Sequence, residues 1–238
     1  MGATTAPLAH RRTRRFRRGT WLLLALLAMA LVLAGCGGRR ETPEPTQPAE
    51  SAQSEDLPRY RPAPVFTLTD QMGRRISTES DLKGKVLLVN FIFTHCTDTC
   101  PLQTAQMAHL QRQLVEAGIT PDQVRLVSIS VDPVRDTPEV LRRYAESYHA
   151  DPAYWHFLTG PVEEVRQVVV EGFKVPAQIP DHHQHGDHGG GDHGESLIAH
   201  SDLTVLVDRQ GQVRAYYPIE VWDWEKVLAD VRRVLAEP

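Results

Sequence analysis

Val86-Leu87-Leu88-Val89-Asn90-Phe91-Ile92-Phe93 runs directly into Thr94-His95-Cys96-Thr97-Asp98-Thr99-Cys100-Pro101, and this stretch decides the fold. Its first half is apolar, contains several β-branched residues and is too short for an independent helix, which favours a buried strand. A polar turn follows, and then a helix-compatible segment from Leu102 to Ala117. The sequence therefore predicts strand, loop and helix, with both cysteines where the strand leads into the helix N-terminus.

The placement of Cys96 and Cys100 indicates thiolate chemistry. The N–H groups and the positive dipole end of a helix N-terminus favour an anion, so we expect the pKa of these thiols to be lowered. The two residues are four apart and would share one face once the first helical turn forms. Such a pair can close a disulfide or hold one soft metal ion between two sulfurs. A structural disulfide or two buried thiols is the simpler alternative.

The first 36 residues are predicted to be a targeting segment. Six arginines between Arg11 and Arg18 precede an apolar run from Trp21 to Leu33, and Leu33-Ala34-Gly35-Cys36 follows. This order resembles a bacterial signal peptide with a lipobox, in which Cys36 is lipidated and becomes the mature N-terminus. A retained membrane anchor is the alternative, although the apolar run is short for a full span. Both interpretations place the remaining chain in the cell envelope, at the extracytoplasmic face of a membrane.

Residues 37–58 are predicted to be a disordered tether, and residues 59–238 one folded domain. The tether is rich in Pro, Glu, Gln and Ser and has almost no large apolar side chains, so it cannot bury a core. The chain has 26 basic residues, of which six lie in the leader, leaving 20 against 30 acidic ones and a net charge of −10. This balance argues against nucleic acid as a partner.

The apolar periodicity of the domain predicts an α/β core. Residues 64–70, 124–131 and 155–160 are expected to be strands, with helices opening after Asp136 or Thr137 and at Pro161. Residues 199–218 predict a β-hairpin, and residues 224–235 a closing amphipathic helix. Strands that alternate with helices argue for a parallel α/β core. The helical positions expected to face the core are Met107, Leu110, Leu114, Val115, Val140, Leu141, Tyr144, Val162, Val165 and Val168.

Charged side chains follow the 124–131 strand. Asp132, Arg135 and Asp136 could form a charged site. Helix capping and a local ion pair explain them more simply, so we interpret them as residues that brace this loop.

Residues 181–195 form a low-complexity insertion that holds five of the eleven histidines, namely His182, His183, His185, His188 and His193. Such a tract cannot pack, but at neutral pH it presents imidazoles and carboxylates to divalent metal ions. We interpret it as an auxiliary metal collector of lower affinity. The alternative is a solvated insertion without a metal function.

Three separated blocks together resemble the SCO/SenC family: residues 91–101, residues 130–138, and His200-Ser201 before Leu206-Val207-Asp208. The resemblance implies a thioredoxin-like α/β fold, with a central mixed β-sheet flanked by helices and a C-terminal β-hairpin and helix. It also implies a membrane-tethered copper-binding protein that helps to assemble the dinuclear copper centre of cytochrome c oxidase. The copper ligands of the family correspond here to Cys96, Cys100 and His200.

Coordination chemistry agrees with this correspondence. Two thiolates favour Cu(I), and an added imidazole gives a three-coordinate site that also accepts Cu(II), whereas structural zinc would want a fourth protein ligand. We expect His95 to point away, because it is adjacent to Cys96. The partner would be the copper-site subunit of the oxidase.

A thiol-disulfide oxidoreductase is the rival function, so enzymatic activity stays open. In that reaction Cys96 attacks a partner disulfide and Cys100 resolves the mixed intermediate. It would keep the copper-site cysteines of the oxidase reduced. A peroxidase of related fold is a weaker third option, because no Pro-x-x-x-Thr-x-x-Cys pattern precedes either cysteine.

Overall fold

The computed structural model describes residues 56–97, 99–179 and 202–238, all within the unit Ser54–Pro238. Several predictions lie outside these residues: the signal peptide with Cys36, the tether up to residue 55, the histidine-rich insertion 181–195 and the ligand position His200. Within the described parts of the chain, no helix has both the length and the apolar character needed to cross a bilayer.

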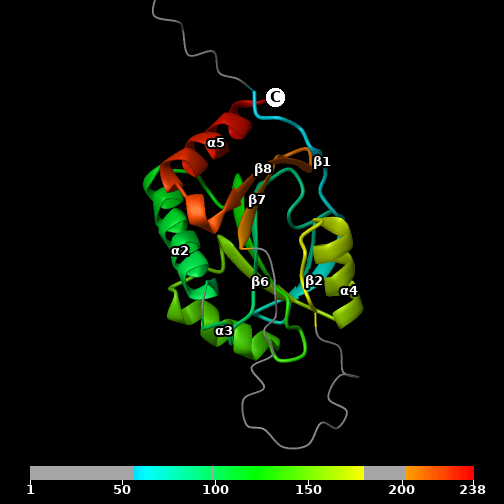
Figure 1. The fold of residues 1–238 in the computed structure, drawn as a ribbon. Coiled ribbons are helices and arrows are strands. Elements are labelled where there is room, and N and C mark those ends of the chain that lie inside the picture. The colour runs from blue at the N-terminus through cyan, green and yellow to red at the C-terminus, as the bar shows by residue number, and fades with distance from the viewer. Residues whose placement is uncertain (1–55, 98, 180–201) are drawn as a thin grey trace, which may run out of the picture. The chain divides into compact units, whose positions relative to one another are not determined.

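A mixed sheet of eight strands, in the order β1-β8-β7-β4-β5-β6-β2-β3, forms the centre of the domain (Figure 1). The three central strands β4, β5 and β6 are parallel, and the other pairings are antiparallel. All seven residues of β4 are buried, because a central strand covered on both faces must be apolar on both. The strands are β1 (Arg61–Pro62), β2 (Thr67–Asp70), β3 (Arg75–Ser77), β4 (Val86–Ile92), β5 (Val124–Ser130), β6 (Trp155–Thr159), β7 (Leu203–Val207) and β8 (Gln212–Pro218).

Helices cover both faces of the sheet (Figure 1). The first face carries α2 (Cys100–Glu116), α3 (Pro138–Ser147) and α5 (Trp224–Ala236), and the short 3₁₀ turn η3 (Ile219–Val221) leads into α5. The second face carries α4 (Val162–Arg166), which continues as the π-helical turn η1 (Gln167–Gly172). Ring contacts mark the two layers: Tyr144 of α3 packs on Phe157 with centroids 6.0 Å apart, and Phe173 packs on Phe91 at 5.5 Å.

The predicted α/β core, mixed sheet, hairpin and closing helix are confirmed, with three local differences. Helix α2 begins at Cys100 rather than Leu102. The helix after Pro161 changes to π-helical geometry at Gln167. Val115, predicted to be in the core, is 54% exposed. It lies one residue, and therefore about 100°, beyond Leu114 on the face that packs inward.

For the other helices, the predicted burial of the core-facing residues is confirmed in part. Leu141, Val165 and Val168 are buried, whereas Val140, Tyr144 and Val162 are only half-buried. The half-buried residues lie at the margin of each apolar stripe, where one side of the side chain still faces solvent. Such margins are normal for surface helices that cover a sheet.

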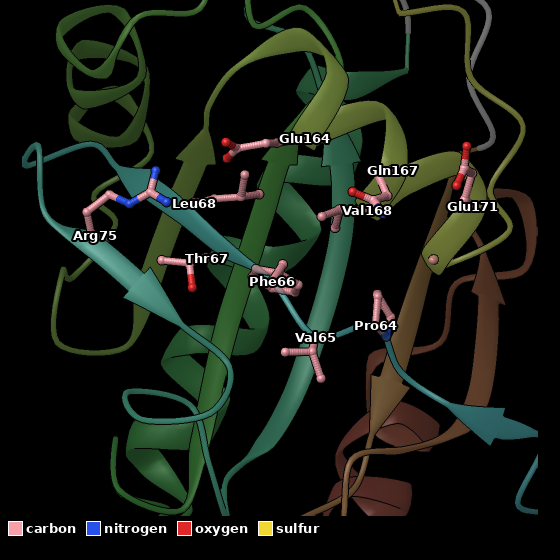
Figure 2. Close-up of a pocket in the computed structure, with 11 residues that line it drawn as sticks. Pro64, Val65, Phe66, Thr67, Leu68, Arg75, Glu164, Gln167, Val168 and Glu171 are labelled. Carbon is pink, nitrogen blue, oxygen red and sulfur yellow. The ribbon is translucent and has the colours of Figure 1, made fainter.

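A groove with a volume of about 510 Å³ lies between β2 and the α4–η1 segment (Figure 2). Arg75, Glu164 and Glu171 give it charges of both signs, and neither cysteine lines it. Gly172 also lines the groove, and a Cβ at this position would lie 2.6 Å from the Cβ of Pro64, which is too close for a side chain. The groove is therefore separate from the cysteine pair.

Candidate metal centre

Both cysteines lie at the carboxyl end of the central strand β4. The carbonyl oxygen of Phe93 accepts a hydrogen bond from the N–H of Cys96 at 3.2 Å, which closes a turn over residues 93–96. Cys100 is the first residue of α2 and is fully buried, whereas Cys96 is half-buried in the loop. The expectation that the pair shares one helical face is wrong, because Cys96 lies outside the helix. A turn, not a helix, brings Cys96 to Cys100.

Burial raises the pKa of the Cys100 thiol far above its ordinary value, and a hydrogen bond with the side chain of Cys96 adds to the effect. The expected lowering of the pKa is therefore wrong for Cys100. Loss of hydration at a fully buried sulfur outweighs the favourable field of the helix N-terminus. Cys100 is a thiol at neutral pH, and a metal ion that binds it must displace the proton. The contact with Cys96 also shows that the two side chains meet.

The loop before Cys96 is held by a carboxylate from another loop. Asp136 accepts hydrogen bonds from the N–H of Thr94 at 3.1 Å and from the hydroxyl of Thr94 at 2.6 Å. The hydroxyl of Ser130 donates to the same carboxylate at 2.6 Å. Burial raises the pKa of Asp136, although these donors oppose the shift.

The bracing role predicted for the charged loop is confirmed in part. Asp132 pairs locally with Arg135, and Thr137 caps α3, its hydroxyl accepting from the N–H of Val140. Asp136 braces its own loop through Ser130 and also reaches across to Thr94.

A second pair of residues fixes the start of α2. Thr99 occupies the N-cap position of α2, yet its hydroxyl makes no capping bond. It donates instead to Oδ1 of Asp202 at 2.8 Å. Gln103, one turn into α2, donates from its side chain to the carbonyl of Leu203 at 3.2 Å. The helix that begins at Cys100 is thus attached to the segment that opens β7.

Among the predicted site residues, the structure brings Cys96 and Cys100 together. His95 is exposed, and its Nδ1 lies 3.1 Å from the hydroxyl of Thr94. Within residues 56–97, 99–179 and 202–238, no group of three His, Cys, Asp or Glu side chains is arranged to hold a metal ion. The third predicted ligand, His200, lies outside these residues.

Sequence reasoning did not assign roles to Thr94, Thr99 or Asp202. Each is an ordinary polar residue whose partner lies 42 or 103 positions away. The signal available for Thr94 and Thr99 was that they lie within two residues of Cys96 and Cys100, and for Asp202 that it lies two residues after His200.

The profile of the SCO1/SenC family matches residues 55–236. The SCO1 protein homolog of Bacillus subtilis is 33% identical over 204 residues, which cover 85% of this chain and 90% of the relative. A SCO1/SenC family lipoprotein from Bacillus anthracis has a solved structure that matches with a TM-score of 0.62 and 31% identity, covering 74% of this chain and 96% of that one.

Two further solved structures are similar in fold and sequence. BsSco, described as having a disulfide switch and as a member of the Sco family of cytochrome c oxidase assembly proteins, has a TM-score of 0.60 and 32% identity, covering 77% of this chain and 98% of its own. ScoI of Bradyrhizobium japonicum, solved with copper bound, has a TM-score of 0.58 and 30% identity. The match covers 72% of this chain and 98% of ScoI. A profile that spans most of the chain and relatives above 30% identity establish that this protein belongs to the SCO1/SenC family.

Proposed function

We propose that this protein is a copper chaperone of the bacterial cell envelope that delivers copper to the dinuclear copper site of cytochrome c oxidase. The observation that carries the proposal is the meeting of Cys96 and Cys100 at the end of β4. It is supported by membership of a family in which one solved relative holds copper and another is described as an oxidase assembly protein.

Cys96 and Cys100 bind the cargo as thiolates, and His200 completes the site. Two soft sulfur donors suit Cu(I), and the imidazole extends the site to Cu(II). His200 lies outside the described residues, but Asp202 follows two positions later and is hydrogen-bonded to Thr99. Two residues span at most about 7 Å, so this bond supports a position of His200 close to the cysteines.

Transfer proceeds by ligand exchange. Cys100 is enclosed and gives up its proton on loading, whereas Cys96 is partly open to solvent. A ligand from the recipient therefore displaces Cys96 first and Cys100 second. The half-exposed thiol is the point of entry and exit for the metal.

The N-terminal segment places this chemistry at a membrane. Lipidation of Cys36 after signal cleavage anchors the chain, and the Pro- and Glu-rich segment that follows is the tether. The predicted tether of residues 37–58 ends too late, because the carbonyls of Leu57 and Pro58 already accept hydrogen bonds from Arg214. One solved relative is described as a lipoprotein, which supports the assignment. The acidic surface of the mature chain guides docking on the oxidase subunit. The histidine-rich insertion, residues 181–195, acts as an auxiliary collector of metal ions.

A second function, thiol-disulfide exchange, is favoured by the disulfide switch described for BsSco. The unequal exposure of the two thiols fits that chemistry. Cys96 is accessible to attack a partner disulfide, and the buried Cys100 then resolves the mixed disulfide. The protein would keep the copper-site cysteines of the oxidase reduced before loading.

Copper titration of variants tests the proposal. We expect the parent protein to bind one copper tightly, Cys96→Ser and Cys100→Ser to lose it in both oxidation states, and His200→Ala to lose mainly Cu(II). His95→Ala is the matched control, because His95 is an exposed histidine beside the same pair. Deletion of residues 181–195 should remove only weaker binding. Tight copper binding by either serine variant contradicts the site, and loss of tight binding on deletion, with disulfide exchange intact, favours the reductase.

A further inference from the structure

The turn that carries Cys96 is fixed from outside its own loop. Asp136, between β5 and α3, is fully buried. One oxygen of its carboxylate accepts the N–H of Thr94 and the other accepts the hydroxyl of Thr94. Thr94 is the second residue of the turn that the N–H of Cys96 closes onto Phe93. The carboxylate therefore holds the turn two residues before the thiol.

Asp136 is itself held by the sheet. The hydroxyl of Ser130, at the end of β5, donates to Asp136 at 2.6 Å, and the N–H of Asp136 donates to the carbonyl of Asp132 at 2.9 Å. Val131 in turn donates to the carbonyl of Ile92, the last residue of β4, at 2.8 Å. The carboxyl ends of β4 and β5 thus position Asp136, independently of the cysteine loop that contains Thr94.

A buried carboxylate is costly unless several donors satisfy it. Three donors converge on Asp136, and two of them come from one residue of the cysteine loop. We propose that Asp136 is a positioning residue, which acts through Thr94 to hold the Cys96 thiol at the separation from Cys100 that copper requires. The inference rests on the proposed copper function of the cysteine pair.

The test compares four variants of the full chain. Asp136→Ala removes all three acceptor contacts. Thr94→Val keeps the backbone N–H contact with Asp136 and removes the contacts of the hydroxyl with Asp136 and with Nδ1 of His95. Asp136→Asn is the conservative variant, because its carbonyl can accept from Thr94 N–H and Ser130 while its amide donates to the Thr94 hydroxyl. Asp132→Ala is the matched control, since Asp132 is equally buried in the same loop and contacts Arg135 instead of Thr94.

Two quantities are measured, namely Cu(I) affinity against a competing chelator and the rate of Cys96 alkylation by iodoacetamide in copper-free, reduced protein. Loss of a charge-assisted hydrogen bond predicts roughly tenfold weaker Cu(I) binding in Asp136→Ala and Thr94→Val. We expect faster alkylation of Cys96 in both, recovery of both quantities in Asp136→Asn, and values like those of the parent in Asp132→Ala.

The inference is overturned if Asp136→Ala and Thr94→Val match the parent in both quantities. Equal losses in Asp132→Ala overturn it as well, because the effect would then be general damage to the loop. The alkylation rate needs no metal. If the parent protein fails to bind Cu(I), the proposed function fails, and the alkylation rates alone still decide whether Asp136 positions Cys96.

Discussion

Cys96 and Cys100 have the same chemistry in two different environments. Cys100 has 0% of its surface exposed and a raised pKa, because charge on its sulfur is poorly solvated. Cys96 lies in a turn and is half-buried. The two thiols therefore differ in exposure in the free protein, where Cys96 is accessible for ligand exchange and Cys100 is enclosed. Under the proposed chaperone function, this inequality would let the pair hold copper and still release it.

Alkylation should reveal this inequality directly. In the reduced, copper-free protein we expect iodoacetamide to modify Cys96 at least about tenfold faster than Cys100, since the thiolate is the reactive species and access is required. Peptide mass spectrometry over time gives both rates, and the same reaction in denaturant is the control, where the two rates should converge. Preferential modification of Cys100 in the folded protein would contradict the described environments.

The lowered pKa of His156 makes the stability of the folded protein depend on pH. Its ring is buried in β6, and burial, assisted by the positive charge of Arg125, lowers its pKa from 6.5. Asp70 lies 3.5 Å from Nδ1 and only partly opposes the shift. The unfolded chain then takes up the proton first as the pH falls below about 6.5. Stability should therefore decrease with falling pH, by up to about 1.4 kcal/mol per pH unit for this group.

The matched variant is His156→Gln, which keeps a polar side chain without a titrating group. We expect the difference between its unfolding free energy and that of the parent to change between pH 7.5 and pH 5.5, with the parent losing more. Urea unfolding at several pH values measures both. Parallel curves for the two proteins would show that His156 does not titrate as its burial predicts.

At the scale of elements, the N-cap residue of α2 connects the helix to the segment before β7 and does not cap the helix with its side chain. The hydroxyl of Thr99 at the N-cap bonds to Asp202, whereas Thr137 at the N-cap of α3 caps its own helix. We expect Thr99→Val to weaken Cu(II) binding about tenfold, because it loosens the segment that follows His200. Thr137→Val should cost about 1 kcal/mol of stability and leave copper binding unchanged.

Copper titration and thermal unfolding of both valine variants separate the two roles. Unchanged Cu(II) affinity in Thr99→Val, or an equal loss in Thr137→Val, would contradict a specific connection between α2 and β7.

The elements themselves were predictable where the signal is local. The buried run of β4 and the amphipathic pattern of α5 follow from neighbouring residues, and both elements formed close to their expected limits. Of the candidate site, the sequence predicted that Cys96 and Cys100 lie together, whereas the role of His200 stays a prediction outside the described residues. Asp136 was noted in the sequence, yet a local role explained it, because no local pattern encodes a contact 42 residues away. The pKa of Cys100 was mistaken for a similar reason, since burial is a property of the whole fold.

At the scale of the whole domain, Arg214 joins distant parts of the chain at the end remote from the cysteines. It lies in β8 with 1% of its side chain exposed. Its guanidinium bonds to Asp208 at 2.9 Å, to Glu237 at 2.6 Å and to the carbonyl of Leu57 at 2.6 Å. Asp208 follows the carboxyl end of β7, while Asp202, near the cysteines, precedes its start. Leu57, near the first described residue of the domain, is thus attached at the end of β7 that lies opposite to Asp202.

This arrangement separates stability from copper chemistry. Arg214→Ala leaves Asp208 buried without its cation, so we expect a loss of about 3–5 kcal/mol of unfolding free energy. Arg59→Ala is the control, because Arg59 pairs with the same Glu237 but is 56% exposed, and such pairs contribute at most about 1 kcal/mol. Urea unfolding measures both losses, and Cu(I) affinity should be unchanged in either folded variant. A weakened Cu(I) affinity in Arg214→Ala would mean that the two ends of β7 are coupled and that the contacts of Arg214 with Asp208 and Leu57 affect copper binding.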